Sequence, residues 1–409
     1  MGIGRCLHPH HRPAWRHLQH HPGPGLAACR GGGLLPAGQE PQSGACHGHR
    51  QEACPSRAGR IEPVIHASFH CAVAAGPDGR HRGVGLFPGG TMKKLIYGLM
   101  FAASLAAAHA ATFTMDTKYF TPPDGMATIG DSHGDIAVSP RGEIYVSVQG
   151  GAHSGIQVYS AEGKYLRNVP GAQTDFHGFI IAGGKIYGVS RLTQHIVEME
   201  LDGRTVLDIP ARTAIADAYI EHAAGKPATN LTGIAVAPNG DIYVTDGYGT
   251  NYIHRFDKKG KYISSFGGKA EPYGFDTAHK IVIDTRTKPA RLLATDRRHN
   301  RILAMSLDGK LQGVVAENLR LPSAMSIYKD ELAVGELDGR ITILDKDGKV
   351  IATIGQNDTA TETKSNKAPP DIWKGDRFYA VHGVAYDRRG DLLVTEFNQF
   401  GRLTKVKRE

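Results

Sequence analysis

The sequence predicts an all-β chain folded as a six-bladed β-propeller. A unit of apolar alternation, turn and second apolar alternation occurs six times, first at residues 136–147. Side chains that alternate with a period of two are typical of strands, and about four strands per 40–50 residues are typical of a propeller blade. Each of the first five units is followed by a hairpin with a turn glycine, at Gly163, Gly203, Gly260, Gly309 and Gly348.

The remaining units define the order of the blades. The first half of the unit returns at residues 179–190, 234–246, 281–296, 325–336 and 384–396. Only residues 401–407 follow the sixth unit, which gives a third strand but no fourth. Residues 112–120 alternate weakly, and we expect them to supply the missing strand. N- and C-terminal strands would then close the ring and leave no open edge. Residues 356–377 are expected to be an insertion on one face.

Residues 92–110 have the three parts of a secretory signal peptide. Met92-Lys93-Lys94 is a basic head, residues 95–107 are apolar, and Ala108-His109-Ala110 is a small-x-small cleavage site. The apolar run is too short for a spanning helix. We therefore expect translation from Met92, cleavage after Ala110, and a propeller of residues 111–409 located in the periplasm or secreted.

Residues 1–91 have the composition of a mis-assigned start or a disordered leader. They hold all five cysteines and 11 of the 21 histidines, but no lysine and no apolar periodicity. The cysteines and histidines lack the paired spacing of a zinc module. A cysteine-rich leader is the alternative interpretation.

Composition changes once these segments are set aside. Residues 111–409 contain no cysteine, so an exported product would have no disulfides and its core must provide the stability. Residues 1–91 carry nine arginines against four acidic residues, and the signal segment carries two lysines, so the net charge of +8 falls to +1. We therefore expect no nucleic-acid partner. No later segment is apolar enough to span a membrane, and we expect a monomer.

The residues that begin the innermost strand of each blade are the candidate site, because these strands line the central channel. We call them the channel positions. In blade order they are His133, His177, Thr232, His279, Ser323 and His382. The histidines of the second, fourth and sixth blades form a triangle around the axis. Three imidazoles suit one Zn²⁺ with an open coordination position. Alternatively, a polar residue fills each tight turn and bonds to backbone. His133, one residue out of register beside Asp135, is expected outside the triangle, as a structural or substrate contact.

Part of the sequence resembles NHL-repeat propellers, and in particular the lyase half of the peptide-amidating enzyme, peptidylamidoglycolate lyase. The resemblance covers roughly residues 176–397. It is carried by VTDGYGTNYI at 244–253, AHKIV at 278–282 and ATDRRHNRI at 294–302.

The resemblance implies a set of site residues. The three zinc-binding histidines of the family match His177, His279 and His382. The catalytic tyrosine of the family matches Tyr248, and one of its catalytic arginines matches Arg297. Three positions depart from the family. Its second catalytic arginine is matched by Gln149, a methionine by Ala380, and a calcium-binding acid by Gly383. A calcium site is therefore not expected, and half of the carboxylate clamp is missing.

Three functions follow from these residues. The first is a zinc lyase that cleaves the C–N bond of an N-acyl-α-hydroxyglycine, a small molecule or peptide with a carboxylate, and releases an amide and glyoxylate. Tyr248 would be the base, Arg297 the carboxylate anchor, and Gln149 and His133 substrate contacts. Nearby positive charge favours the phenolate form that a tyrosine base needs, and arginine binds a carboxylate bidentately.

The second function is that of a non-catalytic propeller that binds a peptide or glycan. The third, a calcium lactonase, would need acidic and amide ligands where histidines stand.

Overall fold

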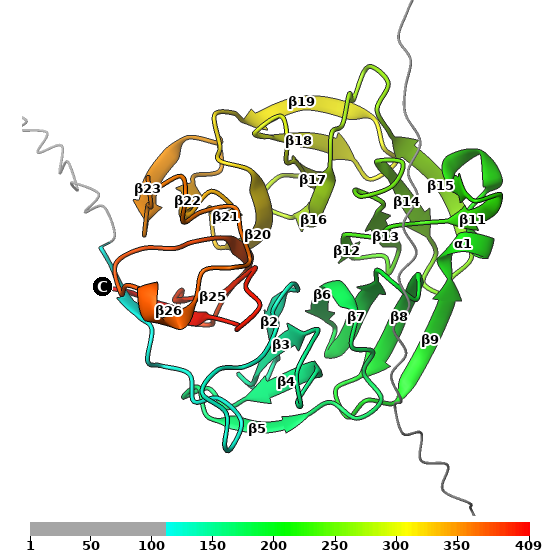
Figure 1. Cartoon of the computed structure of the whole chain (residues 1–409). Helices are drawn as coiled ribbons and strands as arrows, with labels where there is room; N and C mark the ends of the chain where they lie inside the picture. Colours follow the sequence, from blue (N-terminus) through cyan, green and yellow to red (C-terminus); the bar gives the residue numbers. More distant parts are fainter. Residues whose placement is uncertain (1–111) are drawn as a thin grey trace, which may run out of the picture. The chain divides into compact units, whose positions relative to one another are not determined.

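The computed structural model describes residues 112–409, which form six four-stranded antiparallel sheets around a central channel (Figure 1). The expectations for residues 1–91 and for the signal segment lie outside the described residues. Within residues 112–409, no helix has both the length and the apolarity to cross a bilayer. The predicted six-bladed β-propeller is confirmed.

The first three blades follow the chain from the channel outward. Blade 1 contains β2 (Ile136–Val138), β3 (Ile144–Val148), β4 (Gly155–Tyr159) and β5 (Tyr165–Asn168). Blade 2 contains β6 (Phe176–Ala182), β7 (Lys185–Ser190), β8 (His195–Glu200) and β9 (Thr205–Pro210). Blade 3 contains β12 (Gly233–Val236), β13 (Ile242–Thr245), β14 (Tyr252–Phe256) and β15 (Tyr262–Gly267).

The last three blades repeat this order. Blade 4 contains β16 (Ala278–Asp284), β17 (Arg291–Asp296), β18 (Arg301–Ser306) and β19 (Leu311–Ala316). Blade 5 contains β20 (Pro322–Tyr328), β21 (Glu331–Glu336), β22 (Arg340–Leu344) and β23 (Val350–Ile354). Blade 6 contains β24 (Val381–Tyr386), β25 (Leu392–Glu396), β26 (Leu403–Arg408) and β1 (Phe113–Asp116).

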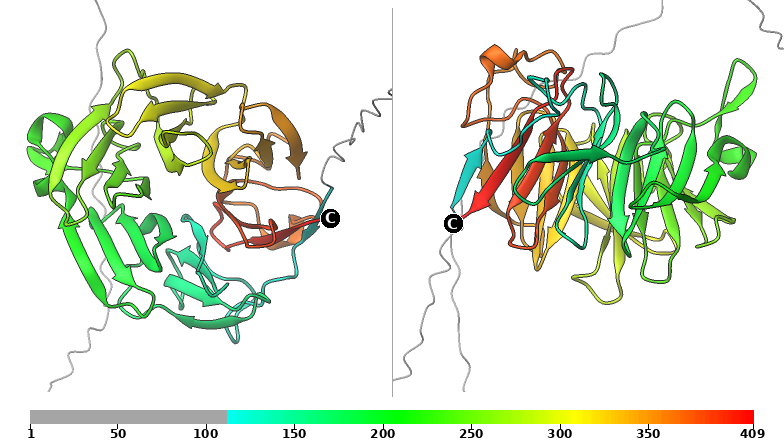
Figure 2. Two further views of the ribbon diagram at one scale, coloured as in Figure 1. Left: turned by 180° about the vertical axis from the view of Figure 1, so that it is seen from behind. Right: turned by 90° about the horizontal axis from the view of Figure 1, so that it is seen from below.

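The ring closes as the sequence predicts, because β1 is the outermost strand of blade 6 (Figure 2). β1 pairs antiparallel with β26, with Met115 opposite Val406. An ion pair of 2.9 Å between Lys407 Nζ and Asp116 Oδ2 joins the same two strands. The partner strands come from opposite ends of the described chain, and β1 covers the edge of β26 that would otherwise be unpaired.

Two insertions depart from the regular blade. The insertion between blades 2 and 3 was not predicted and contains α1 (Ala211–Ala214), η1 (Asp217–Tyr219), β10 (Glu221–Ala223) and β11 (Lys226–Ala228). The predicted insertion of residues 356–377 lies between β23 and β24 and contains only the short helix η2 (Pro370–Ile372). Both insertions precede an innermost strand, so they leave the sheets at the end where the channel positions lie.

The hydrophobic core lies between the blades. Six clusters of buried side chains are present, one at each interface of neighbouring blades. The turn glycines of the outer hairpins fit these interfaces. Gly203 has φ +98°, and a Cβ there would lie 2.0 Å from the Pro170 carbonyl oxygen, while Gly348 would approach Val315 equally closely. Both the left-handed backbone and the close contact explain why glycine recurs in these turns.

We predict that the contact of β1 with the core is needed for stability. Met115 packs against the cluster between blades 5 and 6, so Met115→Asp places a charge at an apolar contact and should lower the free energy of unfolding by about 2–3 kcal/mol. Met115→Leu, which keeps volume and apolarity, should cost less than about 1.5 kcal/mol. Denaturant unfolding measures both. An unchanged midpoint for Met115→Asp would show that ring closure contributes little.

Candidate functional site

The channel positions lie at one end of the innermost strands. His177, His279 and His382 are each the second residue of β6, β16 and β24, and their exposed fractions are 0%, 2% and 2%. Thr232 and Ser323, in blades 3 and 5, are equally buried. The predicted alternation of histidines with hydroxyl residues is therefore present around blades 2 to 6.

The three predicted histidines face one another across the channel. The ring centroid of His177 lies 4.9 Å from that of His279 and 4.9 Å from that of His382, and His279 and His382 are 5.0 Å apart. The rings are inclined to one another by 74–84°. This near-equilateral arrangement brings one imidazole from each alternate blade to the axis.

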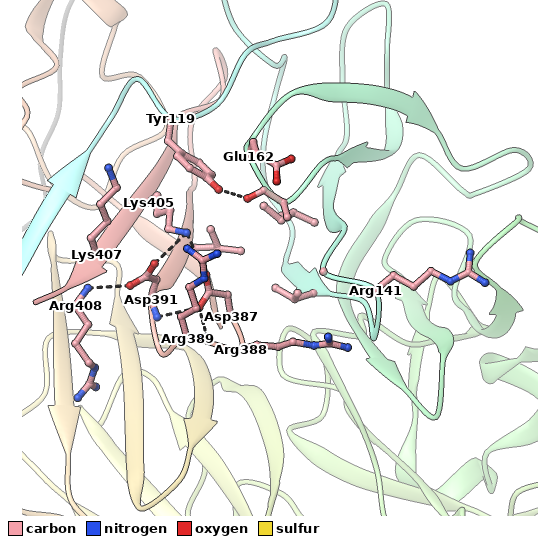
Figure 3. Close-up of a pocket in the computed structure, with 15 residues that line it drawn as sticks. Tyr119, Arg141, Glu162, Asp387, Arg388, Arg389, Asp391, Lys405, Lys407 and Arg408 are labelled. Carbon is pink, nitrogen blue, oxygen red and sulfur yellow. Dashed lines mark hydrogen bonds and ion pairs between the residues drawn. The ribbon is translucent and has the colours of Figure 1, made fainter.

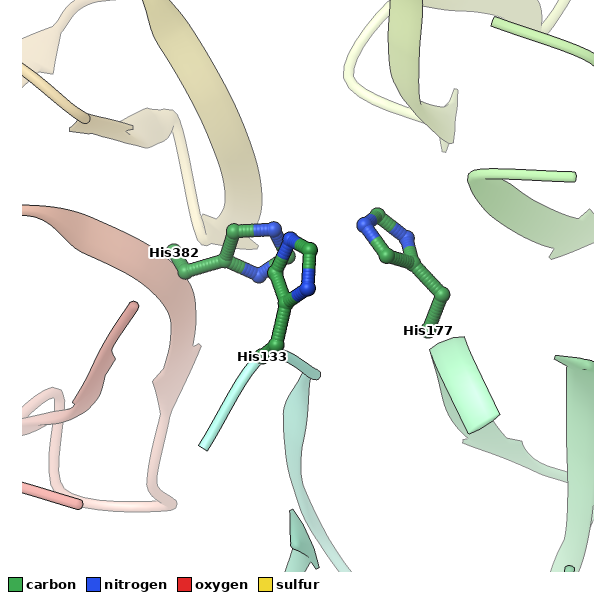
Figure 4. A group of neighbouring side chains, drawn as sticks. All are labelled: His133, His177 and His382. Atoms are coloured by element: carbon green, nitrogen blue, oxygen red, sulfur yellow. The ribbon is translucent and has the colours of Figure 1, made fainter. Parts of the chain in front are cut away.

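His133 belongs to this cluster, which the sequence analysis did not expect. Its ring lies 4.9 Å from His177 and 4.8 Å from His382 (Figure 4). One ring nitrogen from each of His133, His177 and His382 lies within 4.8 Å of the others, a spacing that can hold a metal ion. His133 precedes β2 in an irregular segment tied to blade 6 by Ser132, so its ring lies against Phe397 and reaches the other histidines.

The imidazoles of His177, His279 and His382 each make the same kind of hydrogen bond to a backbone carbonyl. His177 Nδ1 lies 2.8 Å from the Thr232 carbonyl oxygen, and His279 Nδ1 lies 2.8 Å from that of Ser323. His382 Nδ1 lies 3.4 Å from the carbonyl oxygen of Gly134. In each case the acceptor belongs to the next blade. A carbonyl can only accept, so Nδ1 carries the proton and Nε2 presents its lone pair.

Side-chain hydroxyl groups bind the backbone carbonyl of the residue that precedes each of these histidines in the sequence. Ser147 Oγ donates to the carbonyl of Phe176 at 2.6 Å, Thr232 Oγ1 to that of Ala278 at 2.9 Å, and Ser323 Oγ to that of Val381 at 2.6 Å. The three acceptors each directly precede a channel histidine. The odd-numbered blades therefore orient the imidazoles of the even-numbered blades by side-chain and backbone contacts, as outer-shell groups do around metal ligands.

All four imidazoles are neutral at physiological pH. Burial lowers the pKa of His133 to about 3 and places those of His177, His279 and His382 well below the ordinary value. The positive charge of Arg297 acts in the same direction on all four. Neutral imidazole is the form that binds a metal. The buried Nε2 of His382 has no hydrogen-bond partner among the described residues, so it is a free ligand atom.

A second set of equivalent residues, which we call the second ring, lies at the same backbone position in every blade, beside the channel position. In each blade, the backbone N–H of one residue donates to the carbonyl two residues before the channel position, over 2.7–3.2 Å. All of these residues are half-buried. In blade order they are Gln149, Arg191, Tyr248, Arg297, Leu337 and Phe397.

Tyr248 contacts two of the histidines directly, and Arg297 contacts Tyr248. The Tyr248 hydroxyl lies 3.3 Å from His177 Nε2 and 3.0 Å from His279 Nε2. Arg297 Nη1 donates to the same hydroxyl at 3.1 Å. A phenol oxygen, two imidazole nitrogens and a guanidinium thus converge at one point, which is an arrangement suited to proton transfer.

Gln149 takes a different role in the described conformation. Its Nε2 donates to the carbonyl oxygens of His133 and Phe176, both at 3.2 Å. The side chain therefore braces blade 1 against blade 2 beside the channel. Sequence analysis missed Arg191, although the repeat alignment contains the signal: Arg191 follows β7 as Arg297 follows β17.

Gly383, which stands where the lyase family has an acidic residue, lies in a closely packed part of the backbone. A Cβ at this position would lie 2.8 Å from Thr395 Oγ1 and 3.1 Å from the Asp135 Cα. A larger side chain at position 383 would therefore require Thr395 of the same blade and the backbone of blade 1 to shift.

A buried ion pair crosses the channel next to the histidines. Lys280 Nζ of blade 4 lies 2.5 Å from Asp135 Oδ2 of blade 1, and the side chains are 7% and 5% exposed. The same oxygen accepts the backbone N–H of Phe179 at 3.1 Å. Desolvation raises the pKa of Asp135, and the charge of Lys280 opposes that rise.

A pocket of about 660 Å³ lies elsewhere. It is lined by residues such as Arg141, Asp387 and Arg389, which follow the ends of β2 and β24 opposite to the histidines (Figure 3). Lys405 of β26 forms ion pairs there with Asp387 and Asp391, at 3.1 and 3.0 Å. These charges stabilise the closure of blade 6.

Known structures share this architecture at low sequence identity. A protein of unknown function from Bacteroides thetaiotaomicron is 14% identical with a TM-score of 0.50, over 73% of this chain and 76% of that one. A streptogramin B lyase is 15% identical with a TM-score of 0.49, over 73% and 98% of the two chains. A gluconolactonase from Xanthomonas campestris is 14% identical with a TM-score of 0.47, over 69% and 89%. No protein-family model matches the sequence. Similarity at this level supports the fold alone.

We predict that the Lys280–Asp135 pair behaves as a coupled unit. Lys280→Met leaves Asp135 buried without its partner and should lower the free energy of unfolding by about 3–5 kcal/mol. The double variant Lys280→Met with Asp135→Asn removes both charges and keeps an acceptor for Phe179. It should recover most of the loss in denaturant unfolding. A double variant less stable than Lys280→Met would contradict this.

Proposed function

We propose that the chain is an exported, metal-dependent lyase of the peptidylamidoglycolate lyase type, built on an NHL-type propeller. It would cleave an N-acyl-α-hydroxyglycine into an amide and glyoxylate. The observation that carries the proposal is the convergence of Tyr248, Arg297 and two channel histidines at one phenol oxygen. Export is supported by the signal-peptide pattern at residues 92–110.

We assign the metal to His177, His279 and His382. Among the described residues, the ring nitrogens found within 4.8 Å of one another are those of His133, His177 and His382, and His279 is not in that set. We leave His133 out of the ligand set because its ring makes no hydrogen bond to any described residue and lies against Phe397. The other three have Nδ1 fixed by backbone carbonyls, and this second contact is typical of histidine ligands. A set of three neutral imidazoles with one unpartnered buried nitrogen fits zinc. His133 would border the open side of the site and contact substrate.

Zinc bound at these histidines would act as a Lewis acid toward the substrate hydroxyl. The residues of the chain supply the rest. Tyr248 lies between two of the histidines and would accept the proton of that hydroxyl. Arg297, which already donates to the Tyr248 oxygen, stabilises negative charge on it. The same guanidinium can bind the substrate carboxylate with its remaining N–H groups.

The reaction balances without a further reactant. The O–H bond breaks as its proton moves to Tyr248, and the oxygen electrons form the C=O bond of glyoxylate. The C–N bond then breaks, its electron pair goes to the amide nitrogen, and that nitrogen takes up a proton. Tyr248, once protonated, is the candidate donor, so the chain returns to its starting protonation state.

We predict which histidines hold the ion. In the full chain, His177→Ala, His279→Ala and His382→Ala should each lose the bound zinc, because each removes one of three ligands. His133→Ala should keep it. Metal content after dialysis against a zinc buffer measures this. Zinc retained by His279→Ala and lost from His133→Ala would assign the metal to His133, His177 and His382 instead.

We predict that Tyr248 is needed for turnover but not for folding. Tyr248→Phe should keep zinc and the unfolding midpoint, and should lower glyoxylate release from α-hydroxyhippurate by roughly 10²–10⁴-fold. Tyr252→Phe is the matched control on the same blade, because its ring packs on Tyr219 away from the histidines. If the unmodified chain releases no zinc-dependent glyoxylate above the Tyr248→Phe level, a non-catalytic binding propeller is the better interpretation.

A further inference from the structure

The second ring divides the channel mouth into a polar and an apolar half. Blades 1 to 4 contribute four polar side chains in succession, and blades 5 and 6 contribute Leu337 and Phe397. Tyr248 of blade 3 belongs to the polar half, and the neighbouring blades 2 and 4 contribute Arg191 and Arg297. Since the six backbone positions are equivalent, the side chains alone decide what this mouth can bind.

Arg191 occupies the same backbone position as Arg297. The Arg191 N–H donates to the carbonyl of Asp175 at 3.2 Å, and the Arg297 N–H to that of Thr277 at 3.1 Å. Both acceptors lie two residues before a channel histidine. The two guanidinium groups therefore start from blades 2 and 4, on either side of Tyr248 on blade 3.

Neither guanidinium is neutralised by the protein. Of the residues that the structure describes, none forms an ion pair with Arg191 or Arg297. By contrast, Arg301 and Arg402 lie 2.8 and 2.7 Å from acidic partners. The buried Nε of Arg191 also lacks a hydrogen-bond partner among the described residues. An arginine that is partly buried with unused donors is prepared to bind an anion.

Arg191 also faces an open space. It lines a cavity of about 360 Å³ together with Gln194, Thr229, Asn230 and Glu221 of β10. The cavity gives a ligand access to Arg191 beside the channel.

We propose that Arg191 is the second carboxylate-binding residue of the site, and that Arg191 and Arg297 hold the substrate carboxylate from the two sides of Tyr248. Phe397 and Leu337 would receive the apolar acyl group on the opposite side. This inference rests on the proposed function and names its substrate class: an acylated glycine with a free carboxylate. Gln149 cannot replace Arg191, because its amide is committed to two backbone carbonyls.

The test separates binding of the carboxylate from turnover. Hippurate carries the carboxylate and a phenyl group but no α-hydroxyl, so it cannot be cleaved. Hippuramide is its uncharged counterpart. Calorimetric titration of the full chain should show hippurate binding at least tenfold more tightly than hippuramide, as charge-assisted hydrogen bonds predict.

Variants test whether Arg191 is responsible for the preference for hippurate over hippuramide. Arg191→Met should weaken hippurate binding about tenfold or more and leave hippuramide unchanged, and Arg191→Lys should restore part of the loss. Arg204→Met is the matched control, because Arg204 lies on the same blade in an exposed pair with Glu200. Hippurate affinity unchanged in Arg191→Met, or no preference for hippurate in the unmodified chain, would overturn the inference. Loss of the preference is measured without turnover, so absent glyoxylate release alone would count only against the lyase.

Discussion

The site depends on the hydrogen bond from Nδ1 of each even-blade histidine to a backbone carbonyl of the next blade. This contact fixes the tautomer, the direction of Nε2 and the distance of the ring from the axis. It also makes the site a property of the closed ring. The acceptor for His382 is Gly134 in blade 1, so blade 6 must lie against blade 1 before the third imidazole is oriented. Pairing of β1 with β26 completes blade 6 and therefore supports the site from the outer edge of the ring.

Close packing of the backbone accounts for glycine beside two of the channel histidines. The innermost strands approach so closely that a Cβ on Gly178 would lie 2.4 Å from the Thr232 carbonyl oxygen, the acceptor for His177. The same crowding holds at Gly383 beside blade 1. Glycine after the channel histidine therefore permits this close approach in blades 2 and 6, whereas His279, which Lys280 follows, makes the same Nδ1 contact without a glycine.

Period-two alternation was sufficient to predict the blade number, the closing strand and the channel positions, because these follow from local pattern and repeat length. Contacts across the ring were not predictable. Asp135 and Lys280 are 145 residues apart, and no local rule pairs them. The closeness of His133 to His177 and His382 was not predictable either, because its irregular segment is held by blade 6 rather than by a strand. Arg191 was missed because resemblance directed attention to Gln149, whereas the hydrogen-bond register places Arg191 level with Arg297.

The charge of the mouth favours an anionic ligand. The four imidazoles are neutral, and Asp135 is paired with Lys280, so neither cluster offers net negative charge. Arg191 and Arg297 form no ion pair with any described residue, and Arg297 donates to a phenol oxygen that contacts two histidines. A metal ion would increase the positive charge further. In the proposed function, a substrate carboxylate would neutralise the positive charges of Arg191 and Arg297, which no described acidic residue pairs with. Binding of the substrate carboxylate and stabilisation of the reacting charge would both depend on these arginines in that function.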